Sequence, residues 1–293
     1  MKEIVFVILH YNAIADTIEC INSIEKTNVG VNYSVVVVDN NSPNKSGIEL
    51  YHKYKDSQRV VVILNDKNEG FARGNNIGFV YAKKTYNPNF IVLLNNDTII
   101  LQNNFFSLVK EEYDLNKFAV LGPVIETPNK INNLNPGRIK MPSIPYYLWY
   151  TFKVLILYIF SLCNLDVFYK NCKSLLTRTT NVGDGTYCKD SKSDVMLHGC
   201  FLVFSRVYIC TFNGLNDRTF LFGEEDLLYL RLKTNKLMSY YSPKIRIYHK
   251  EDVSTGTIRL KGRYFRQFMY KQYIHSSCII ISELLKLKFN RLK

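Results

Sequence analysis

Four short apolar runs within the first hundred residues constrain the fold more than any other feature of the sequence. They occupy residues 4–9, 35–38, 60–64 and 90–94. The runs are rich in β-branched residues and almost uninterrupted, as expected of strands that are covered on both faces. This rhythm predicts a parallel sheet, because parallel strands need long crossover connections between them.

The segments between the apolar runs are compatible with helices. Ile18, Ile21 and Ile24 recur at helical spacing near residues 16–23, and residues 47–56 and 70–84 fill the next two gaps. Alternating strands and helices of this kind predict an α/β fold with a doubly wound, mostly parallel, Rossmann-like sheet.

A cluster of polar residues follows each apolar run. Ligands of doubly wound sheets bind beyond the carboxyl ends of the strands, so these clusters are the first candidates for a site. Each cluster alone is compatible with turns and helix caps, since Asn, Asp and Gly favour both. Four clusters at one sheet edge favour a ligand site, and they are residues 10–12, 39–42, 65–76 and 95–98.

Two common phosphate-binding motifs are absent from the sequence. No GxGxxG follows the first apolar run, and no GxxxxGK[ST] occurs anywhere. This argues against a dinucleotide site of the Rossmann type and against a P-loop. A ligand phosphate would then be neutralised in another way, for example by a metal ion held by a carboxylate at a strand end.

Positive charge is concentrated at the C-terminal end. The chain of 293 residues has 38 Lys and Arg, 25 Asp and Glu and a formal net charge of +13, and residues 244–293 hold twelve of the basic and three of the acidic residues. Aromatic residues are interleaved with these charges, which favours an anionic membrane surface as the partner. A solvated helix face and a nucleic-acid-binding surface are the alternatives.

Cysteine usage and the first residues indicate the compartment. Seven cysteines at irregular spacing do not suggest a disulfide framework, and without a CxxC pair a structural zinc site is not expected. The N-terminal apolar run is too short and too soon polar for a signal peptide. The expected compartment is a reducing cytoplasm.

Residues 144–168 form an unusually apolar and aromatic insert. Only twelve residues separate Lys153 from Asp166, fewer than the ~20 that span a bilayer. The insert therefore predicts a buried or an interfacial helix. The interfacial alternative is favoured by a group of residues that resembles an aromatic belt, namely Tyr146, Tyr147, Trp149 and Tyr150.

Seven motifs together resemble glycosyltransferase family 2, which has the GT-A fold. They are HYN (10–12), VVVVDNNS (35–42), NEGFARGNN (68–76), LLNNDT (93–98), HGCFLVFSR (198–206), FLFGEEDLLYLR (220–231) and KIRIYHKEDVST (244–255). The resemblance covers roughly residues 3–255. It is closest to the bacterial rhamnosyltransferase-like branch that builds surface polysaccharides.

The resemblance also implies a domain organisation. Residues 1–255 would be the GT-A domain, with a nucleotide-binding half at 1–125 and an acceptor half at 126–255 that carries the 144–168 insert. Residues 256–293 would be a basic, amphipathic helical region.

Family resemblance implies a nucleotide-sugar site along the sheet edge. Asp39 would accept a hydrogen bond from the pyrimidine base, although it also suits a helix N-cap shared with Ser42. Arg73 would lie near the phosphates, or would pair with Glu69 instead. The residues expected to bind the nucleotide sugar are His10, Tyr11, Asn12, Asp39, Asn41, Asn68, Gly70, Arg73, Asn76, Asn95, Asn96, Gly199 and Cys200.

Asn95, Asn96 and Asp97 occupy the position of the family's DxD motif, which holds Mg²⁺ or Mn²⁺ against the donor diphosphate. Asn95 replaces the first aspartate, which leaves Asp97 as the one charged ligand of the motif. One carboxylate is still sufficient when substrate phosphates supply further ligands. His249 matches the family's late histidine and would complete the metal site, with Ser254 nearby; a purely structural histidine is the alternative.

The acidic residues Glu224, Glu225 and Asp226 are the candidates for the catalytic base. Inverting sugar transfer needs a carboxylate that takes the proton from the attacking hydroxyl. The family places this base six residues before an arginine, and counting back from Arg231 gives Glu225, with Asp226 and Glu224 as alternatives. The three carboxylates would alternatively complement the charge of a helix N-terminus.

These expectations combine into one functional hypothesis. The chain would be an inverting, metal-dependent glycosyltransferase that moves a hexose, such as rhamnose, from a UDP- or dTDP-linked donor. The acceptor would be a polyprenyl-linked or growing surface polysaccharide, and the enzyme would sit in the cytoplasm at the inner face of the cell membrane, without a nucleic-acid partner. A nucleotidyltransferase, a basic nucleic-acid-binding protein and an inactive scaffold on a similar sheet are the alternatives.

Overall fold

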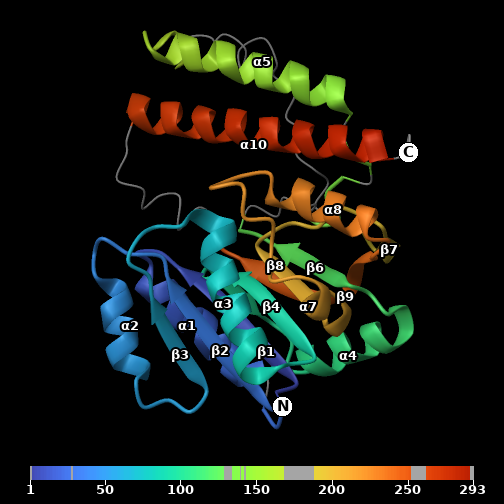
Figure 1. Cartoon of the computed structure of the whole chain (residues 1–293). Coiled ribbons are helices and arrows are strands. Elements are labelled where there is room, and N and C mark those ends of the chain that lie inside the picture. The colour runs from blue at the N-terminus through green and yellow to red at the C-terminus, as the bar shows by residue number, and fades with distance from the viewer. Residues whose placement is uncertain are drawn as a thin grey trace.

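The structure, a computed structural model, is built on one mixed sheet with helices on both faces (Figure 1). It describes residues 2–27, 29–128, 134–138, 140–141, 143–167, 188–251 and 262–290.

The sheet contains nine strands in the order β3-β2-β1-β4-β8-β6-β9-β5, and β7 pairs with β9. The first four strands form a parallel unit, in which β1 lies between β2 and β4 and β2 pairs with β3. β8 runs antiparallel between β4 and β6. The strands are β1 (Ile4–His10), β2 (Tyr33–Asp39), β3 (Val60–Leu64), β4 (Phe90–Asn95), β5 (Thr98–Ile100), β6 (Val120–Glu126), β7 (Lys192–Ser193), β8 (Phe201–Ser205) and β9 (Ser239–His249).

This topology confirms the predicted α/β sheet and its four N-terminal strands. The helices expected near residues 16–23, 47–56 and 70–84 are present with similar bounds, whereas α4 and α7 were not predicted. The described helices are α1 (Ile14–Thr27), α2 (Ser46–Tyr54), α3 (Gly70–Tyr86), α4 (Phe105–Asn116), α5 (Ile144–Ser161), α7 (Arg206–Thr211), α8 (Glu224–Thr234) and α10 (Gly262–Asn290).

Side chains of β1 alternate between two apolar cores. Ile4, Phe6 and Ile8 join the core that is covered by α1, α2 and α4. Val5 and Val7 join the opposite core, which is covered by α3, α7 and α8. All five side chains are fully buried, and burial of each stabilises the fold by about 1.5–3 kcal/mol. The nearly continuous apolar run in the sequence is thus explained by burial on both faces.

Helix α3 lies unusually close to the sheet. A Cβ atom on Gly78 would come within 2.4 Å of Val7 and 2.9 Å of Val38. The close approach brings the first turn of α3 next to the carboxyl ends of β1 and β2, where the ligand site is expected.

Helices α5 and α10 pack side by side beyond the carboxyl ends of the parallel strands β1 to β4 (Figure 1). This pair of helices is here called the helical cap. They run antiparallel, because Tyr147 packs with Ile280 while Arg263 donates to the carbonyl of Leu162. Asp166, which follows α5, is fully buried and pairs with Arg266 at 2.7 Å.

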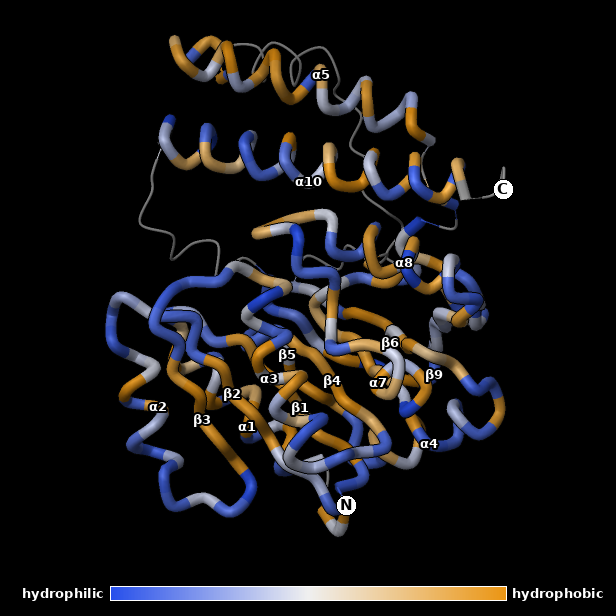
Figure 2. Tube along the Cα trace, in the orientation of Figure 1, coloured by the Kyte–Doolittle hydropathy of each residue, from blue (hydrophilic) through white to orange (hydrophobic). Residues whose placement is uncertain are grey.

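Helix α5 is the one described helix that is long and apolar enough to cross a membrane, judged by length and composition alone. Only 22% of its residues are buried. Figure 2 shows about half of the helix in hydrophobic colours and the rest paler. Its large exposed side chains include Leu148, Trp149, Phe152, Leu155 and Ile159.

The expected domain division stays a prediction. The boundary between residues 255 and 256 lies outside the described residues, as do Ser254 and the last residue of the 144–168 insert. The division between residues 125 and 126 falls within β6.

Candidate active site

The first candidate group consists of Asp97 and His249. Asp97 lies in the turn between β4 and β5, and antiparallel pairing of Thr98 with His249 brings the end of β9 beside it. The His249 Nε2 and Asp97 Oδ1 atoms are 3.2 Å apart. Asp97 is 4% exposed and His249 is 8% exposed. The structure therefore brings together two residues that are 152 positions apart in the sequence.

This pair can hold a divalent cation only with help from a substrate. Asp97 Oδ1 is buried without a hydrogen-bond partner in the described segments and faces His249 Nε2, so these two atoms are the ones available to a cation. No group of three or more His, Cys, Asp or Glu side chains with metal-binding placement occurs among the described residues. One carboxylate and one imidazole fit a cation whose remaining ligands are phosphate oxygens and water.

The second candidate group is the acidic triplet in the first turn of α8. Gly223 starts the helix with a left-handed backbone at φ 81°. Glu225 Oε1 accepts a hydrogen bond from the Gly199 backbone N–H at 3.0 Å, which fastens the carboxylate to the loop before β8. Its side chain is half-buried. Glu225 therefore faces the strand ends.

The other two carboxylates of the triplet point elsewhere. Glu224 is 7% exposed and accepts a hydrogen bond from the Thr219 hydroxyl at 3.0 Å. Burial raises the pKa of Glu224 to about 7. Asp226 accepts a hydrogen bond from the Tyr147 hydroxyl of the helical cap at 2.7 Å, and burial raises its pKa as well.

The loop at residues 198–200 connects the two candidate groups. His198 lies beside His249, with ring centroids 6.3 Å apart, and Gly199 contacts Glu225. Burial lowers the pKa of His198, Glu225 opposes this shift, and His249 adds to it. His198 thus packs beside the partner of Asp97, and the next residue, Gly199, bonds Glu225, so this loop links the two groups; their action on one substrate stays a prediction.

Asp39 lies at the end of β2 and is 6% exposed. Burial raises its pKa, although hydrogen bonds from the Ser42 hydroxyl and backbone N–H oppose the shift. A Cβ atom on Gly47 would come within 2.1 Å of the Asp39 Cγ, so the carboxylate packs directly against the start of α2. Ser42 bonds Asp39 in a local turn, but α2 begins at Ser46 with Lys45 as its N-cap, so the N-cap alternative for Asp39 and Ser42 is wrong. The contact of Asp39 to a base stays a prediction.

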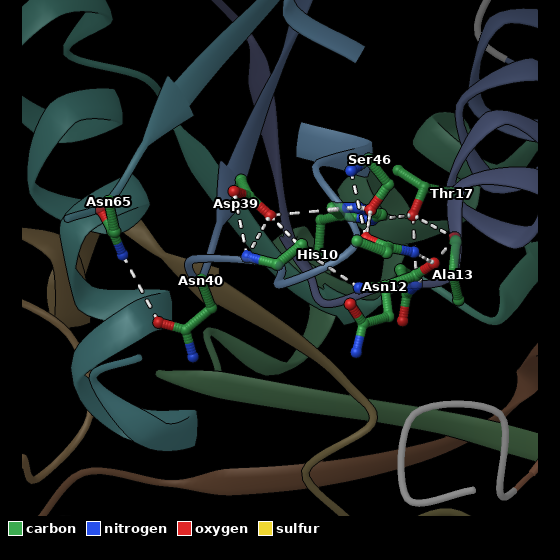
Figure 3. A network of polar contacts seen from close by, with 11 residues as sticks. His10, Asn12, Ala13, Thr17, Asp39, Asn40, Ser46 and Asn65 are labelled. Atoms are coloured by element: carbon green, nitrogen blue, oxygen red, sulfur yellow. Dashed lines mark hydrogen bonds and ion pairs between the residues drawn. The ribbon is translucent and has the colours of Figure 1, made fainter. Parts of the chain in front are cut away.

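His10 is fully buried beneath Asp39 (Figure 3). Its Nδ1 lies 2.7 Å from the Thr17 hydroxyl and its Nε2 lies 2.8 Å from the Ser46 hydroxyl. Burial lowers its pKa to about 4, so the ring is neutral near pH 7. Both ring nitrogens are engaged within the protein, where they join β1 to α1 and α2.

Asn40 is a site-forming residue to which the sequence assigned no role. Its side-chain amide donates to Asn68 Oδ1 and to the Gly70 carbonyl, both at 3.0 Å. Its own Oδ1 accepts the Glu69 backbone N–H at 2.9 Å. These bonds fix the loop before α3. Its place directly after an apolar run was the available signal, and Figure 3 shows it beside Asp39.

Three residues expected to contact the nucleotide sugar lie against the segment before α8, and their contact to a ligand stays a prediction. Gly70 has φ 78°, and a Cβ atom there would lie 2.4 Å from the Phe220 carbonyl. Arg73 Nε donates to the Asp217 carbonyl at 2.8 Å, whereas Glu69 pairs with Lys67. The Asn76 amide bonds both backbone groups of Leu215, at 2.7 and 2.9 Å.

The remaining candidates line the strand ends in different environments. The Asn96 amide is buried and donates to the Ala13 carbonyl and the Thr17 hydroxyl. Asn41 is exposed and donates to the Asp66 carbonyl. Asn12 Oδ1 is buried without a hydrogen-bond partner in the described part of the chain.

The other candidates differ in exposure. Tyr11 and Asn95 are half-buried, Asn68 is exposed, and Gly199 is buried. Cys200 is also buried, and burial raises the pKa of its thiol well above the usual value.

Comparisons with known proteins identify the family and agree with the fold. A family model described as "Glycosyl transferase family 2" matches residues 5–171. No curated protein sequence matches the chain.

Two crystal structures of S. aureus TarS are similar to the chain. The structure of residues 1–349 aligns with 97% of this chain and 70% of that chain, at a TM-score of 0.51 and 14% identity. A second TarS structure aligns with 85% of this chain and 36% of that chain, at a TM-score of 0.52 and 12% identity. At these identities, the likeness concerns the fold.

Proposed function

The chain belongs to glycosyl transferase family 2 and is therefore a glycosyltransferase, and we propose that it is an inverting, metal-dependent hexosyltransferase. The donor would be a UDP- or dTDP-linked hexose such as rhamnose. The acceptor would be a polyprenyl-linked glycan or a growing surface polysaccharide. The observation that carries this proposal is the convergence of Asp97, His249 and Glu225 around the loop at residues 198–200.

Glu225 acts as the general base in the proposed reaction. The acceptor hydroxyl oxygen attacks C1 of the donor sugar while Glu225 takes the hydroxyl proton. The new C1–O bond forms on the face opposite the breaking bond to the diphosphate, which inverts C1 and releases the nucleoside diphosphate. Glu225 is favoured over its neighbours, because it bonds the loop beside His249, whereas Glu224 is buried against Thr219 and Asp226 bonds Tyr147 of the helical cap.

Asp97 and His249 are the proposed holders of Mg²⁺ or Mn²⁺. When bound there, the cation supplies positive charge that stabilises the leaving diphosphate. The backbone N–H of Gly199 orients the Glu225 carboxylate toward the attacking hydroxyl. Asp39 and the other residues that the sequence analysis assigned to nucleotide-sugar binding would bind the donor.

We also propose that the enzyme attaches peripherally to the inner face of the cell membrane. The exposed apolar face of α5 supports this, because amphipathic helices bury such faces in the lipid interface. The +9 balance of residues 244–293, twelve basic minus three acidic, supports attraction to anionic lipid. Residues 256–293 would then be a membrane-attachment region next to the catalytic domain.

The test is release of nucleoside diphosphate from a panel of UDP- and dTDP-hexoses with Mn²⁺ present. We expect Glu225→Gln to lower turnover by roughly 10²–10⁴-fold, as removal of a general base does. Asp97→Ala should lower it comparably and abolish the Mn²⁺ dependence. Asp114→Ala, at an exposed site on α4, is the matched control and should behave like the wild type.

Two outcomes would revise the proposal. Full turnover in Glu225→Gln together with loss in Asp226→Asn would transfer the role of base to Asp226. Turnover by the wild type that is indifferent to chelation of divalent cations would remove the metal from the mechanism.

A further inference from the structure

A cavity of about 230 Å³ lies between the first turn of α8 and the helical cap. Glu225 and Asp226 line one side of it. Its other walls come from α5 with the segment before it, from the loop before α8, and from α10. Among the described residues, Asp97, His249 and the ends of β1 and β2 are not part of its walls, so the cavity adjoins the proposed base but is separate from the proposed donor residues.

Four aromatic rings form a continuous wall of this cavity. Phe222 stacks on Tyr273 with centroids 4.2 Å apart and an angle of 21°. Tyr150 meets Tyr273 edge to face at 6.4 Å, and Tyr146 stacks on Tyr150 at 6.3 Å. The wall therefore joins both helices of the cap to the segment that leads into α8.

The wall and the carboxylates together suit a sugar ring. The faces of aromatic rings carry partial negative charge, and the C–H face of a pyranose carries partial positive charge. The hydroxyl rim of the same sugar needs polar partners, and Glu225, Asp226 and Arg138 provide them. A cavity of roughly 150 Å³ accommodates one benzene ring, so a volume of about 230 Å³ fits one substituted six-membered ring.

Phe222 is held in a costly backbone conformation. Its φ is 70°, which is unusual for a large side chain, and Gly223 follows at 81°. Residues in such conformations are strained and concentrate at ligand-binding positions. Here the left-handed turn places the Phe222 ring against Tyr273 and, one residue later, begins the helix that carries Glu225.

We propose that this cavity is the acceptor subsite and that it binds the terminal pyranose of the acceptor glycan. The ring lies against the wall of Tyr150, Phe222 and Tyr273, and the attacking hydroxyl points to Glu225. This assignment rests on the proposed function. It gives the helical cap a direct part in acceptor recognition, because α5 and α10 supply most of the aromatic wall.

The experiment measures binding of a panel of methyl glycopyranosides to the full-length protein by saturation-transfer NMR, without any donor. We expect saturation transfer to the sugar C–H protons for at least one glycoside. Tyr150→Leu and Tyr273→Leu should weaken its binding at least tenfold, whereas Tyr150→Phe, which keeps the ring, should stay within about twofold of the wild type.

Tyr158→Leu is the matched control, because Tyr158 is a half-buried tyrosine of the same helix whose ring faces Lys271 and not the cavity. A thermal shift with UDP and Mn²⁺ reports separately that each variant is folded and binds nucleotide. Failure of all nucleotides to bind the wild type would count against the proposed function itself.

Two results would overturn the acceptor subsite. One is the absence of saturation transfer to every glycoside of the panel with the folded wild type. The other is glycoside binding by folded Tyr150→Leu and Tyr273→Leu that equals that of Tyr158→Leu.

Discussion

The loop beside the strand ends and the helical cap both contact the first turn of α8, but the two regions are held in different ways. At the strand ends, polar side chains bond one another in a dense network, as His10 does with Thr17 and Ser46. The cap relies on a few polar contacts, among them Asp166 with Arg266. The comparison indicates a rigid edge at the strand ends, where the nucleotide is proposed to bind, and a cap, the proposed acceptor side, that depends on single contacts.

This difference has an energetic consequence. β1 and its neighbours are buried on both faces, so their opening requires global unfolding. The helical cap exposes much of the apolar surface of α5, and its contact with the rest of the protein runs mainly from α10 to α8. Regions of this kind open locally at a lower free energy than the core does. Substitutions in the cap should therefore loosen α5 and α10 without unfolding the sheet.

The largest expected effect is that of Asp166→Ala. The Asp166 carboxylate is fully buried and bonds Arg266 and Tyr270. Burial alone would raise its pKa, but the hydrogen bonds from these two partners outweigh burial and lower the pKa. Hydrogen bonds to a charged group contribute about 1.5–3 kcal/mol each, so loss of the bonds from Arg266 and Tyr270 costs about 4 kcal/mol in total.

Hydrogen exchange measured by mass spectrometry checks this prediction. Amides of α5 and α10 should exchange much faster in Asp166→Ala, while those of β1 and β4 should keep their protection. Asp114→Ala removes an exposed ion pair with Lys117 and should change stability by less than about 1 kcal/mol. Equal loss of protection in the sheet and the cap would show that the two regions unfold as one unit.

Much of the N-terminal, parallel part of the sheet could be predicted from local sequence. The run at residues 90–94 became β4 (Phe90–Asn95), and residues 70–84 became most of α3 (Gly70–Tyr86). Burial on both faces leaves a continuous apolar run, and the polar residue that ends the run marks the strand end. The candidate base and metal residues came from the family resemblance, because no local spacing relates Asp97 to His249.

Long-range contacts were beyond local sequence patterns. Asp166 and Arg266 are 100 residues apart, and neither position signals that the carboxylate is buried. The three carboxylates at the start of α8 look equivalent in the sequence. Their different directions arise from Thr219 and Tyr147, whose positions depend on how the loop and the cap pack.

The second prediction concerns acid stability at the strand ends. The pKa of His10 is about 4 in the folded protein, below the ordinary value of 6.5. Between pH 6.5 and about pH 4, His10 therefore binds a proton in the unfolded chain but not in the folded protein. The contribution of His10 to stability is complete above pH 6.5 and is lost as the pH falls to 4, by about 3 kcal/mol in total.

Chemical denaturation between pH 7 and pH 4 measures this effect. His10→Gln should flatten the dependence of the free energy of unfolding on pH, whatever its effect at pH 7. His52→Gln changes an exposed histidine on α2 and should leave that dependence as in the wild type. An unaltered pH dependence in His10→Gln would mean that the network at the strand ends tolerates a charged histidine.

The smallest effect on stability is expected at the contact between the helical cap and α8. Tyr147→Phe removes the hydroxyl that donates to Asp226, at a cost of about 2 kcal/mol for a hydrogen bond to a charged group. Tyr158→Phe is the control within the same helix. A double-mutant cycle of Tyr147→Phe with Asp226→Asn, followed by urea denaturation, isolates the pairwise energy. A coupling energy indistinguishable from zero would mean that aromatic packing alone holds the cap over α8, and that the two regions differ less than their hydrogen bonds indicate.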